Sequence, residues 1–155
     1  MKTITYLPIS PFRDDVRDLM NQLNAHHLSH CSREICHLTT AEEIANFDHL
    51  MVGAFSDEQL CGMGAIKFMA DYGEITRMFV VDEFRGTGIA KQVLDRLVEA
   101  AIERNLRSLK LETSLKFTRA VRLYQSYGFA TCAPFGDYVH APYNAYMEKQ
   151  LSSQV

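Results

Sequence analysis

Several features that would mark a membrane, secreted or nucleic-acid-binding protein are missing from this chain. No apolar run approaches the ~20 residues that a membrane span requires. The first residues, MKTITYLPISPFRDD, lack the continuous apolar core of a signal peptide. The formal net charge is only -3, whereas nucleic-acid-binding proteins usually carry a basic field. We therefore expect a cytoplasmic protein that binds neither membranes nor nucleic acid.

Cysteine is scarce, and its four residues are scattered at Cys31, Cys36, Cys61 and Cys132. A chain of 155 residues, 47% of them apolar, can bury a core without disulfide bonds. Internal repeats, low-complexity tracts and linkers are missing too. We expect four free thiols and a single folded domain over residues 1–155.

The spacing of apolar residues and of turn residues predicts an α+β fold with the order βααβββαβαββ. Ser10 before Pro11 predicts a helix start, and Thr40 with Glu43 forms a capping box. Asp71, Tyr72 and Gly73 predict a turn between two strands, Thr118 a helix cap, and Asn105 and Gly128 helix ends. The predicted strands are 2–7, 50–55, 59–70, 74–81, 108–113, 129–133 and 144–151, and helices follow Ser10 and cover 41–46, 88–104 and 119–127.

The most informative segment is EITRMFVVDEFRGTGIAKQVLDRLVEAAIERN, residues 74–105. A strand runs into a glycine turn, and the turn opens a long amphipathic helix. The first N–H groups of a helix have no intrahelical partner, and the helix dipole adds partial positive charge there. Gly86 and Gly88 let the backbone approach an anion, because neither carries a Cβ. The pattern indicates a phosphate-binding site.

Two motifs in this region resemble those of the GNAT N-acetyltransferases. RGTGIA, residues 85–90, fits the family's R/Q-x-x-G-x-G/A signature between a strand and a helix. AVRLYQSYGF, residues 120–129, is similar to its A-x-x-L-Y-x-x-x-G-F segment. The resemblance covers about residues 50–150. It implies a mixed, mostly antiparallel central sheet flanked by helices, and acetyl-CoA as co-substrate.

The resemblance also implies where acetyl-CoA binds. The turn should hold its pyrophosphate through backbone N–H groups and the Arg85 side chain. The strand before the turn should grip the pantetheine arm through its backbone, as an added strand would. The cofactor-binding residues implied in this way are Met78, Phe79, Val80, Arg85, Gly86, Thr87, Gly88, Ile89, Ala90 and Lys91.

Three residues are candidates for the chemistry. Tyr124 matches the family's general-acid tyrosine, which returns a proton to the departing thiolate. Glu74 and Glu112 compete as the base that accepts the amine proton, since each matches a catalytic glutamate of a different branch of the family. Some members use no side-chain base, so a structural role for either glutamate stays open.

One position departs from the family pattern, and one cluster is ambiguous. Phe117 stands where many members carry an asparagine that contacts the cofactor. The cluster HHLSHCSREICH, residues 26–37, contains a spacing that could bind zinc on one helical face, although it matches no closed zinc pattern. We expect one or two of these side chains to line the acceptor pocket and the rest to be solvated, with no metal. Arg77 could pair with an acidic substrate, but a surface arginine on a strand is the simpler interpretation.

The combined motifs predict an acetyl-CoA-dependent N-acetyltransferase that acts on a primary amine by direct attack in a ternary complex. The short chain favours a small amine or amino acid over a protein acceptor. Two alternatives stay open: a CoA-binding sensor without turnover, and a zinc protein built on the His/Cys cluster. Because the final strand could present an exposed edge, a homodimer is also expected as one oligomeric state.

Overall fold

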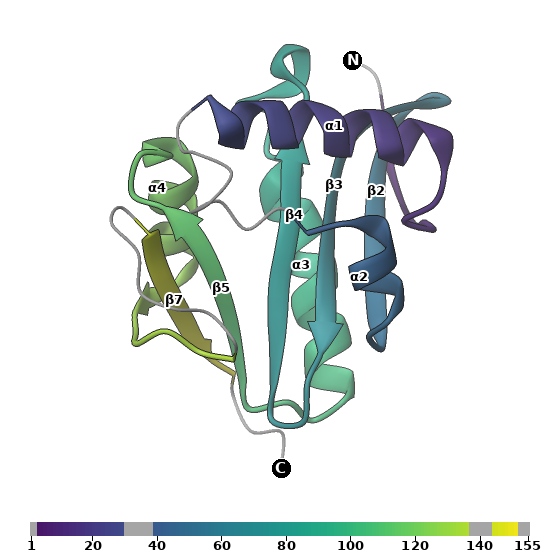
Figure 1. Cartoon of the computed structure of the whole chain (residues 1–155). Helices are drawn as coiled ribbons and strands as arrows, with labels where there is room; N and C mark the ends of the chain where they lie inside the picture. The colour runs from purple at the N-terminus through teal and green to yellow at the C-terminus, as the bar shows by residue number, and fades with distance from the viewer. Residues whose placement is uncertain (1–2, 30–38, 137–143, 152–155) are drawn as a thin grey trace.

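The computed structural model describes residues 3–29, 39–136 and 144–151, and in these residues helices cover both faces of one mixed sheet (Figure 1). Helices α1 and α2 lie on one face, and α3 and α4 lie on the other. The strands are β1 Ile4–Pro8, β2 His49–Ser56, β3 Gln59–Phe68, β4 Tyr72–Val80, β5 Ser108–Ser114, β6 Ala130–Thr131 and β7 Asn144–Gln150, and the helices are α1 Asp14–Leu28, α2 Ala41–Ala45, α3 Ile89–Glu103 and α4 Thr118–Tyr127, with a 3₁₀ turn at Asp82–Phe84.

The strands follow the order β1-β2-β3-β4-β5-β7-β6. β4 and β5 are parallel, and the other neighbouring pairs are antiparallel. The parallel pair requires a crossover, which α3 supplies on one face of the sheet. The observed order of elements, βααβββαβαββ, confirms the predicted α+β class. No helix in the described part of the chain is both long and apolar enough to cross a bilayer.

Two buried clusters hold the helices to the sheet. Val93, Leu94 and Leu97 on α3 pack with Ile75 on one face. On the other face, Val16 of α1 belongs to a second cluster with residues of β2 and β3. Complete burial of a side chain of this size contributes about 1.5–3 kcal/mol. Both helices are therefore anchored mainly by the apolar stripe that the sequence predicts.

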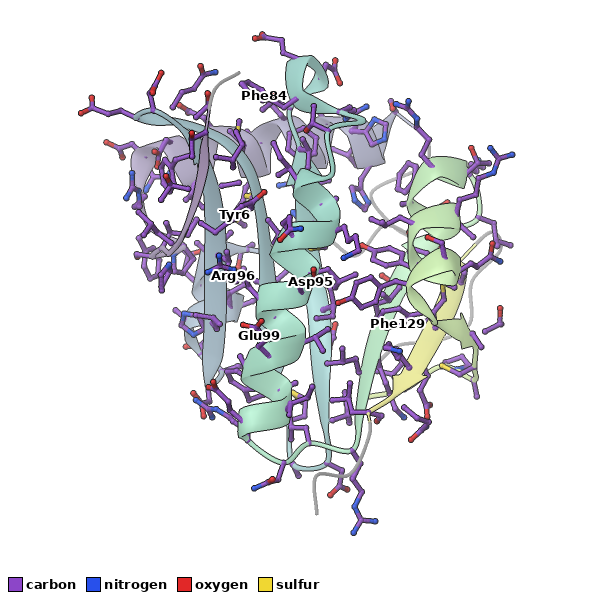
Figure 2. The ribbon with its side chains drawn as sticks, turned by 180° about the vertical axis from the view of Figure 1, so that it is seen from behind. Tyr6, Phe84, Asp95, Arg96, Glu99 and Phe129 are labelled. Carbon is purple, nitrogen blue, oxygen red and sulfur yellow. The ribbon has the colours of Figure 1, made fainter. Side chains whose placement is uncertain are left out.

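Helices α3 and α4 are also joined by a polar contact. Figure 2 looks onto this face and labels Asp95 on α3. The Tyr127 hydroxyl on α4 donates a hydrogen bond to the Asp95 carboxylate, which also pairs with Lys91 at 3.0 Å. Burial and the neighbouring carboxylate raise the pKa of Tyr127. This contact fixes α4 relative to the start of α3, where the glycine turn lies.

A β-bulge interrupts the pairing of β3 with β4. Thr76 pairs with Ala65 and Phe79 pairs with Met63, so two residues of β4 lie opposite Gly64 alone. The first of the two, Arg77, has a left-handed φ of 57°. A Cβ at Gly64 would lie 2.4 Å from the Met78 sulfur and 2.8 Å from a Val93 carbon, so a larger residue opposite the bulge would force these side chains to move.

The predicted start of the first helix is wrong by several residues. α1 begins at Asp14, and Ser10 caps a turn instead: its hydroxyl accepts a hydrogen bond from the N–H of Phe12 at 3.1 Å. Asp14 and Asp15 lie in the first turn of α1, where negative charge interacts favourably with the helix dipole. The Ser-Pro pattern fits a turn as well as a helix start, and here the turn is favoured.

Some of the other predicted ends of helices and strands are confirmed, and others are wrong. The capping bond from the N–H of Glu43 to the Thr40 hydroxyl is present, and Asn105 and Gly128 adopt left-handed φ at helix ends. Tyr72 and Gly73, predicted as a turn, already belong to β4 because Gly73 pairs with both neighbouring strands. Phe117, not Thr118, is the cap of α4, and β3 and β6 are shorter than predicted.

Candidate active site

A cavity of ≈ 580 Å³ opens where β4 and β5 part. The parallel ladder ends at Ile75 and Leu111, yet β4 continues to Val80 and β5 to Ser114. Side chains from α1, the start of α3 and the start of α4 complete the wall. Every predicted site residue except Thr87 lines this cleft. The topology therefore brings the predicted binding and catalytic residues to one place.

The glycine turn forms one end of the cleft. Gly86 and Gly88 adopt φ of 79° and 87°, values that favour glycine, and Gly88 caps α3. A Cβ at either position would meet no described atom within 4 Å, so the space in front of the turn is open. The N–H groups of Ile89, Ala90 and Lys91 begin the helix and have no intrahelical acceptor. This end suits an anion such as a diphosphate.

Arg85 and Thr87 make contacts within the chain. The Arg85 Nε donates to the Val80 carbonyl at 3.1 Å, and its guanidinium lies 3.1 Å from Asp82. Asp82 is 87% exposed, so this ion pair is weak. Binding of a phosphate by Arg85 would need only a turn of the side chain away from Asp82. The Thr87 hydroxyl donates to the Phe84 carbonyl and thereby stabilises the turn.

The end of β4 presents a strand edge to the cleft. Phe79 and Val80 pair with β3 on one side, but they lie beyond the last residue pair that links β4 with β5. Met78, Phe79 and Val80 all line the cleft. A ligand with amide groups could therefore pair with this edge as an additional strand.

Among the carboxylates of the described residues, Glu112 has the largest shift in pKa. It lies on β5, and its Oε2 accepts weak hydrogen bonds from the Asn144 amide at 3.3 Å and the Tyr146 hydroxyl at 3.5 Å. Burial and the negative charge of Glu74 raise the pKa of Glu112 to about 7, against the smaller opposing effect of Tyr146. A carboxyl group with this pKa is partly ionised at neutral pH and can accept a proton there.

Glu74 has a different environment. It is only 5% exposed, and its Oε1 lies 3.6 Å from the Nζ of Lys67, which is buried to a similar degree on the neighbouring strand. Lys67 also lies over the Phe47 ring. A buried ion pair of this kind is costly to break, because either partner alone would be left charged in the interior. Glu74 is thus suited to position and to modulate Glu112.

Tyr124 lies on α4 and is 6% exposed, with its ring packed edge-on against Phe129 at 5.7 Å. It lines the cleft on the wall opposite β4. Burial strongly raises the pKa of Tyr124, so the phenol remains protonated over the working range of most enzymes. The group can donate a hydrogen bond or a proton but is a poor base.

Phe117, where the family pattern has an asparagine, belongs to an aromatic cluster. Its ring stacks on His26 at 4.9 Å with an interplanar angle of 24° and meets His27 edge-on at 4.9 Å. All three residues line the cleft. The prediction that histidines of this cluster line the pocket therefore holds for His26 and His27.

The remaining residues of the His/Cys cluster, 30–37, lie outside the described residues, as do Tyr138 and His140. Within residues 3–29, 39–136 and 144–151, no group of three metal-ligating side chains is found. Cys61 is fully buried, and its thiol donates to the Ala54 carbonyl at 3.3 Å, whereas Cys132 is only partly buried. Burial raises the pKa of Cys61 and of Cys132, so neither is an activated nucleophile.

Sequence reasoning missed several residues of the site. Arg77, interpreted as a surface arginine, is 5% exposed and lines the cleft, so that interpretation is wrong. Asn144 and Tyr146 reach Glu112 only because β7 inserts between β5 and β6. The sequence carries no local signal for them, since the register of distant strands decides which residues face Glu112.

Comparisons with known proteins agree with this geometry. The acetyltransferase (GNAT) family model matches residues 13–129. The chain is 33% identical over 153 residues to an IAA acetyltransferase of Azospirillum brasilense, covering 97% of this chain and 100% of that protein. It is 35% identical over 121 residues to the uncharacterized N-acetyltransferase YsnE of Bacillus subtilis, covering 76% and 80%. The structure of the PaiA N-acetyltransferase of Thermoplasma acidophilum in complex with coenzyme A superposes with a TM-score of 0.74 at 19% identity, covering 96% and 99%.

Proposed function

The chain belongs to the GNAT acetyltransferase family, and from this premise we propose that it transfers the acetyl group of acetyl-CoA to the primary amine of a small acceptor. The observation that carries the proposal is the cleft itself. One continuous cavity is lined by the anion-binding turn, by a strand edge and by an acid–base pair, Glu112 and Tyr124. Together these elements suit the binding of acetyl-CoA and the proton transfers that accompany acetyl transfer.

The turn at residues 85–91 would hold the diphosphate of acetyl-CoA through the first N–H groups of α3. The open space before Gly86 and Gly88 supports this placement, because an approaching phosphate would meet no side chain of those residues. The β4 edge at Phe79 and Val80 would pair with the amides of the pantetheine arm. When bound, acetyl-CoA supplies an activated acyl group whose thioester carbonyl is open to attack by an amine.

Glu112 would accept the proton that the amine must lose. Its pKa is about 7, so near neutral pH a large fraction of the group is ionised and is still basic enough to accept a proton. We assign Glu74 a positioning role, because it is held in the buried pair with Lys67. Its negative charge is one of the two causes that keep the pKa of Glu112 high.

Tyr124 would stabilise the departing sulfur. Its buried phenol stays neutral and can donate to the thiolate as the thioester bond breaks. The amine attacks the carbonyl directly, so the new C–N bond forms while the C–S bond breaks and no acyl-enzyme is needed. The raised pKa values of Cys61 and Cys132 support direct attack, since a nucleophilic cysteine would need the thiolate form.

The proposal is tested by mixing the protein with acetyl-CoA and a panel of primary amines. The release of the CoA thiol reports turnover, and a mass increase of the acceptor by one acetyl group identifies the product. We expect transfer to small amines and loss of transfer in Glu112→Gln. Tight binding of acetyl-CoA without transfer to any amine would contradict the proposal and favour a sensor.

We further infer that residues 1–155 act as one cytoplasmic domain and that the protein can form homodimers. The shared sheet supports a single domain, because the two buried clusters pack on its two faces. Sedimentation of the purified protein across a concentration series would test the second. A single species at the mass of one chain at all concentrations would contradict a dimer.

A further inference from the structure

Arg77 is an unusual residue for the middle of a sheet. It lies in the bulge of β4 with a left-handed φ of 57°, a conformation that costs a residue with a Cβ about 1 kcal/mol or more. It is also 5% exposed, although arginine is seldom buried without a purpose in structure or binding. A left-handed φ and a buried charge, both unfavourable, thus coincide at Arg77, and this residue lines the cleft.

The guanidinium is held in a defined position. Its Nη1 donates a hydrogen bond to the amide oxygen of Asn24 on α1, the helix that lies across the ends of β3 and β4 (Figure 1). A planar guanidinium fixed in this way is preorganised for an oxyanion, because its N–H groups match the two oxygens of a carboxylate.

Arg77 and Glu112 face the same side of the sheet. Leu109 and Leu111 belong to the cluster under α3 and α4, so the alternation along β5 directs Glu112 to the opposite face. Arg77 reaches α1 on that same face. The proposed base and the guanidinium therefore border one chamber of the cleft, on the side away from the α3 core.

The charges around this chamber favour an anion. Arg77 and Lys116 are positive and line the cleft. Glu74 is negative, and its ion pair with Lys67 offsets part of its charge. Glu112 carries less than a full negative charge near neutral pH because its pKa is about 7. The positive side chains of Arg77 and Lys116 favour an acceptor that carries an anion besides its amine.

We propose that Arg77 binds the carboxylate of the acceptor and that the acceptor is a small amino acid whose amine faces Glu112. This inference rests on the proposed acetyl transfer and names the class of its second substrate. A cavity of ≈ 580 Å³ that must also hold the thioester arm leaves room for a compact molecule only. The attraction between a carboxylate and a buried guanidinium is stronger than that between the same groups in water, because the protein interior screens the charges less.

The test compares each common L-amino acid with its own amide, which keeps the amine and removes the negative charge. The amine of an amide is less basic, so more of it is unprotonated near neutral pH, which offsets its weaker nucleophilicity. We expect wild-type protein to prefer the acid by roughly 10- to 100-fold in kcat/KM, the value of a charge-assisted pair. Arg77→Gln should remove this preference by raising the KM for the acid alone.

Two controls separate binding from folding. The KM for acetyl-CoA and the melting temperature report whether Arg77→Gln disturbs the fold. Arg104→Gln removes an exposed arginine that pairs with Asp48 and does not line the cleft, so it should leave the preference intact. Should Arg77→Gln fail to fold, equal rates of the wild-type protein for acid and amide would still overturn the inference, and Arg77→Lys would test whether the preference depends on the guanidinium.

The outcomes are distinct. A preference for the acid that depends on Arg77 supports the inference. Equal rates for acids and amides would overturn it while leaving acetyl transfer intact. An equal loss for both acceptors in Arg77→Gln would show that Arg77 only supports the bulge, which also overturns it. Absence of CoA release with every amine would overturn the proposed function, and this inference with it.

Discussion

Replacing Glu112 by glutamine should make the protein more stable and less active at the same time. The carboxylate is held in a partly buried position beside Glu74, where burial and repulsion both oppose its ionisation. Glutamine keeps the size of the side chain and its hydrogen-bonding atoms but can never carry the charge. The variant therefore resembles the protonated form of the wild-type protein at every pH.

The size of the effect follows from the pKa. Folding raises the pKa of Glu112 from 4.5 to about 7, and each pKa unit corresponds to about 1.36 kcal/mol. The unfolded chain loses the proton first as pH rises, so the folded state loses stability between about pH 4.5 and pH 7. Above that window the wild-type protein carries a penalty of about 3 kcal/mol, which Glu112→Gln removes. Below the window the two proteins should differ little.

Denaturant unfolding at pH 5 and at pH 8 measures this difference. We expect Glu112→Gln to gain about 2–3 kcal/mol at pH 8 and less than about 1 kcal/mol at pH 5. The matched control is Glu148→Gln on β7, whose carboxylate pairs with Lys110 at 3.7 Å and is 26% exposed. That change should alter stability by no more than about 1 kcal/mol, since a pair at this exposure contributes little.

The activity of the same variant completes the test. Loss of a general base lowers the rate by roughly 100- to 10,000-fold. A gain in stability that is equal at pH 5 and pH 8 would refute the electrostatic account of Glu112. Full activity in Glu112→Gln would refute its role as base and return attention to water or to Glu74.

Three further changes probe the rest of the site. Tyr124→Phe keeps the ring against Phe129 and removes only the hydroxyl, so kcat should fall roughly 100-fold with little change in KM; an unchanged kcat would exclude the general acid. Gly88→Ala adds a Cβ at a φ of 87° and should weaken CoA binding about 10-fold by calorimetry through distortion of the turn, which unaltered affinity would contradict. Glu74→Gln leaves Lys67 without its carboxylate partner, so the free energy of unfolding should fall by about 3 kcal/mol. The same change removes the repulsion that raises the pKa of Glu112, so the acidic limb of the pH–rate profile should move to lower pH. A limb that stays in place would show that Glu74 does not modulate the base.

The order of elements was predictable because turn residues separate the apolar runs clearly. Gly128 ends α4 with a φ of 112°, and the glycine turn before α3 has the predicted form. The positions of the glycine turn and of Tyr124 at the cleft were predictable for the same reason, since each belongs to a compact motif. These parts of the site depend on residues that are neighbours in the sequence.

The acceptor side of the site was not predictable in this way. Asn144 lies 32 residues from Glu112 in the sequence, and only the pairing of β5 with β7 brings them together. The burial of Arg77 depends on the bulge opposite Gly64 and on α1 above it. A local pattern of residue types contains neither the register of distant strands nor the position of a helix packed across them.

The bulge at Arg77 lies where the β4–β5 pairing ends and the cleft begins. The β4–β5 ladder stops at Ile75, just before the bulge, and the cleft begins there. Glycine adopts a left-handed φ without steric cost, so Arg77→Gly should keep the bulge and unfold at no lower denaturant concentration than Arg77→Gln, which retains the cost of about 1 kcal/mol. Both variants should bind CoA equally, because the β4 edge is unchanged. A much lower stability of Arg77→Gly than of Arg77→Gln would show that the side chain, rather than the backbone of the bulge, holds the sheet open.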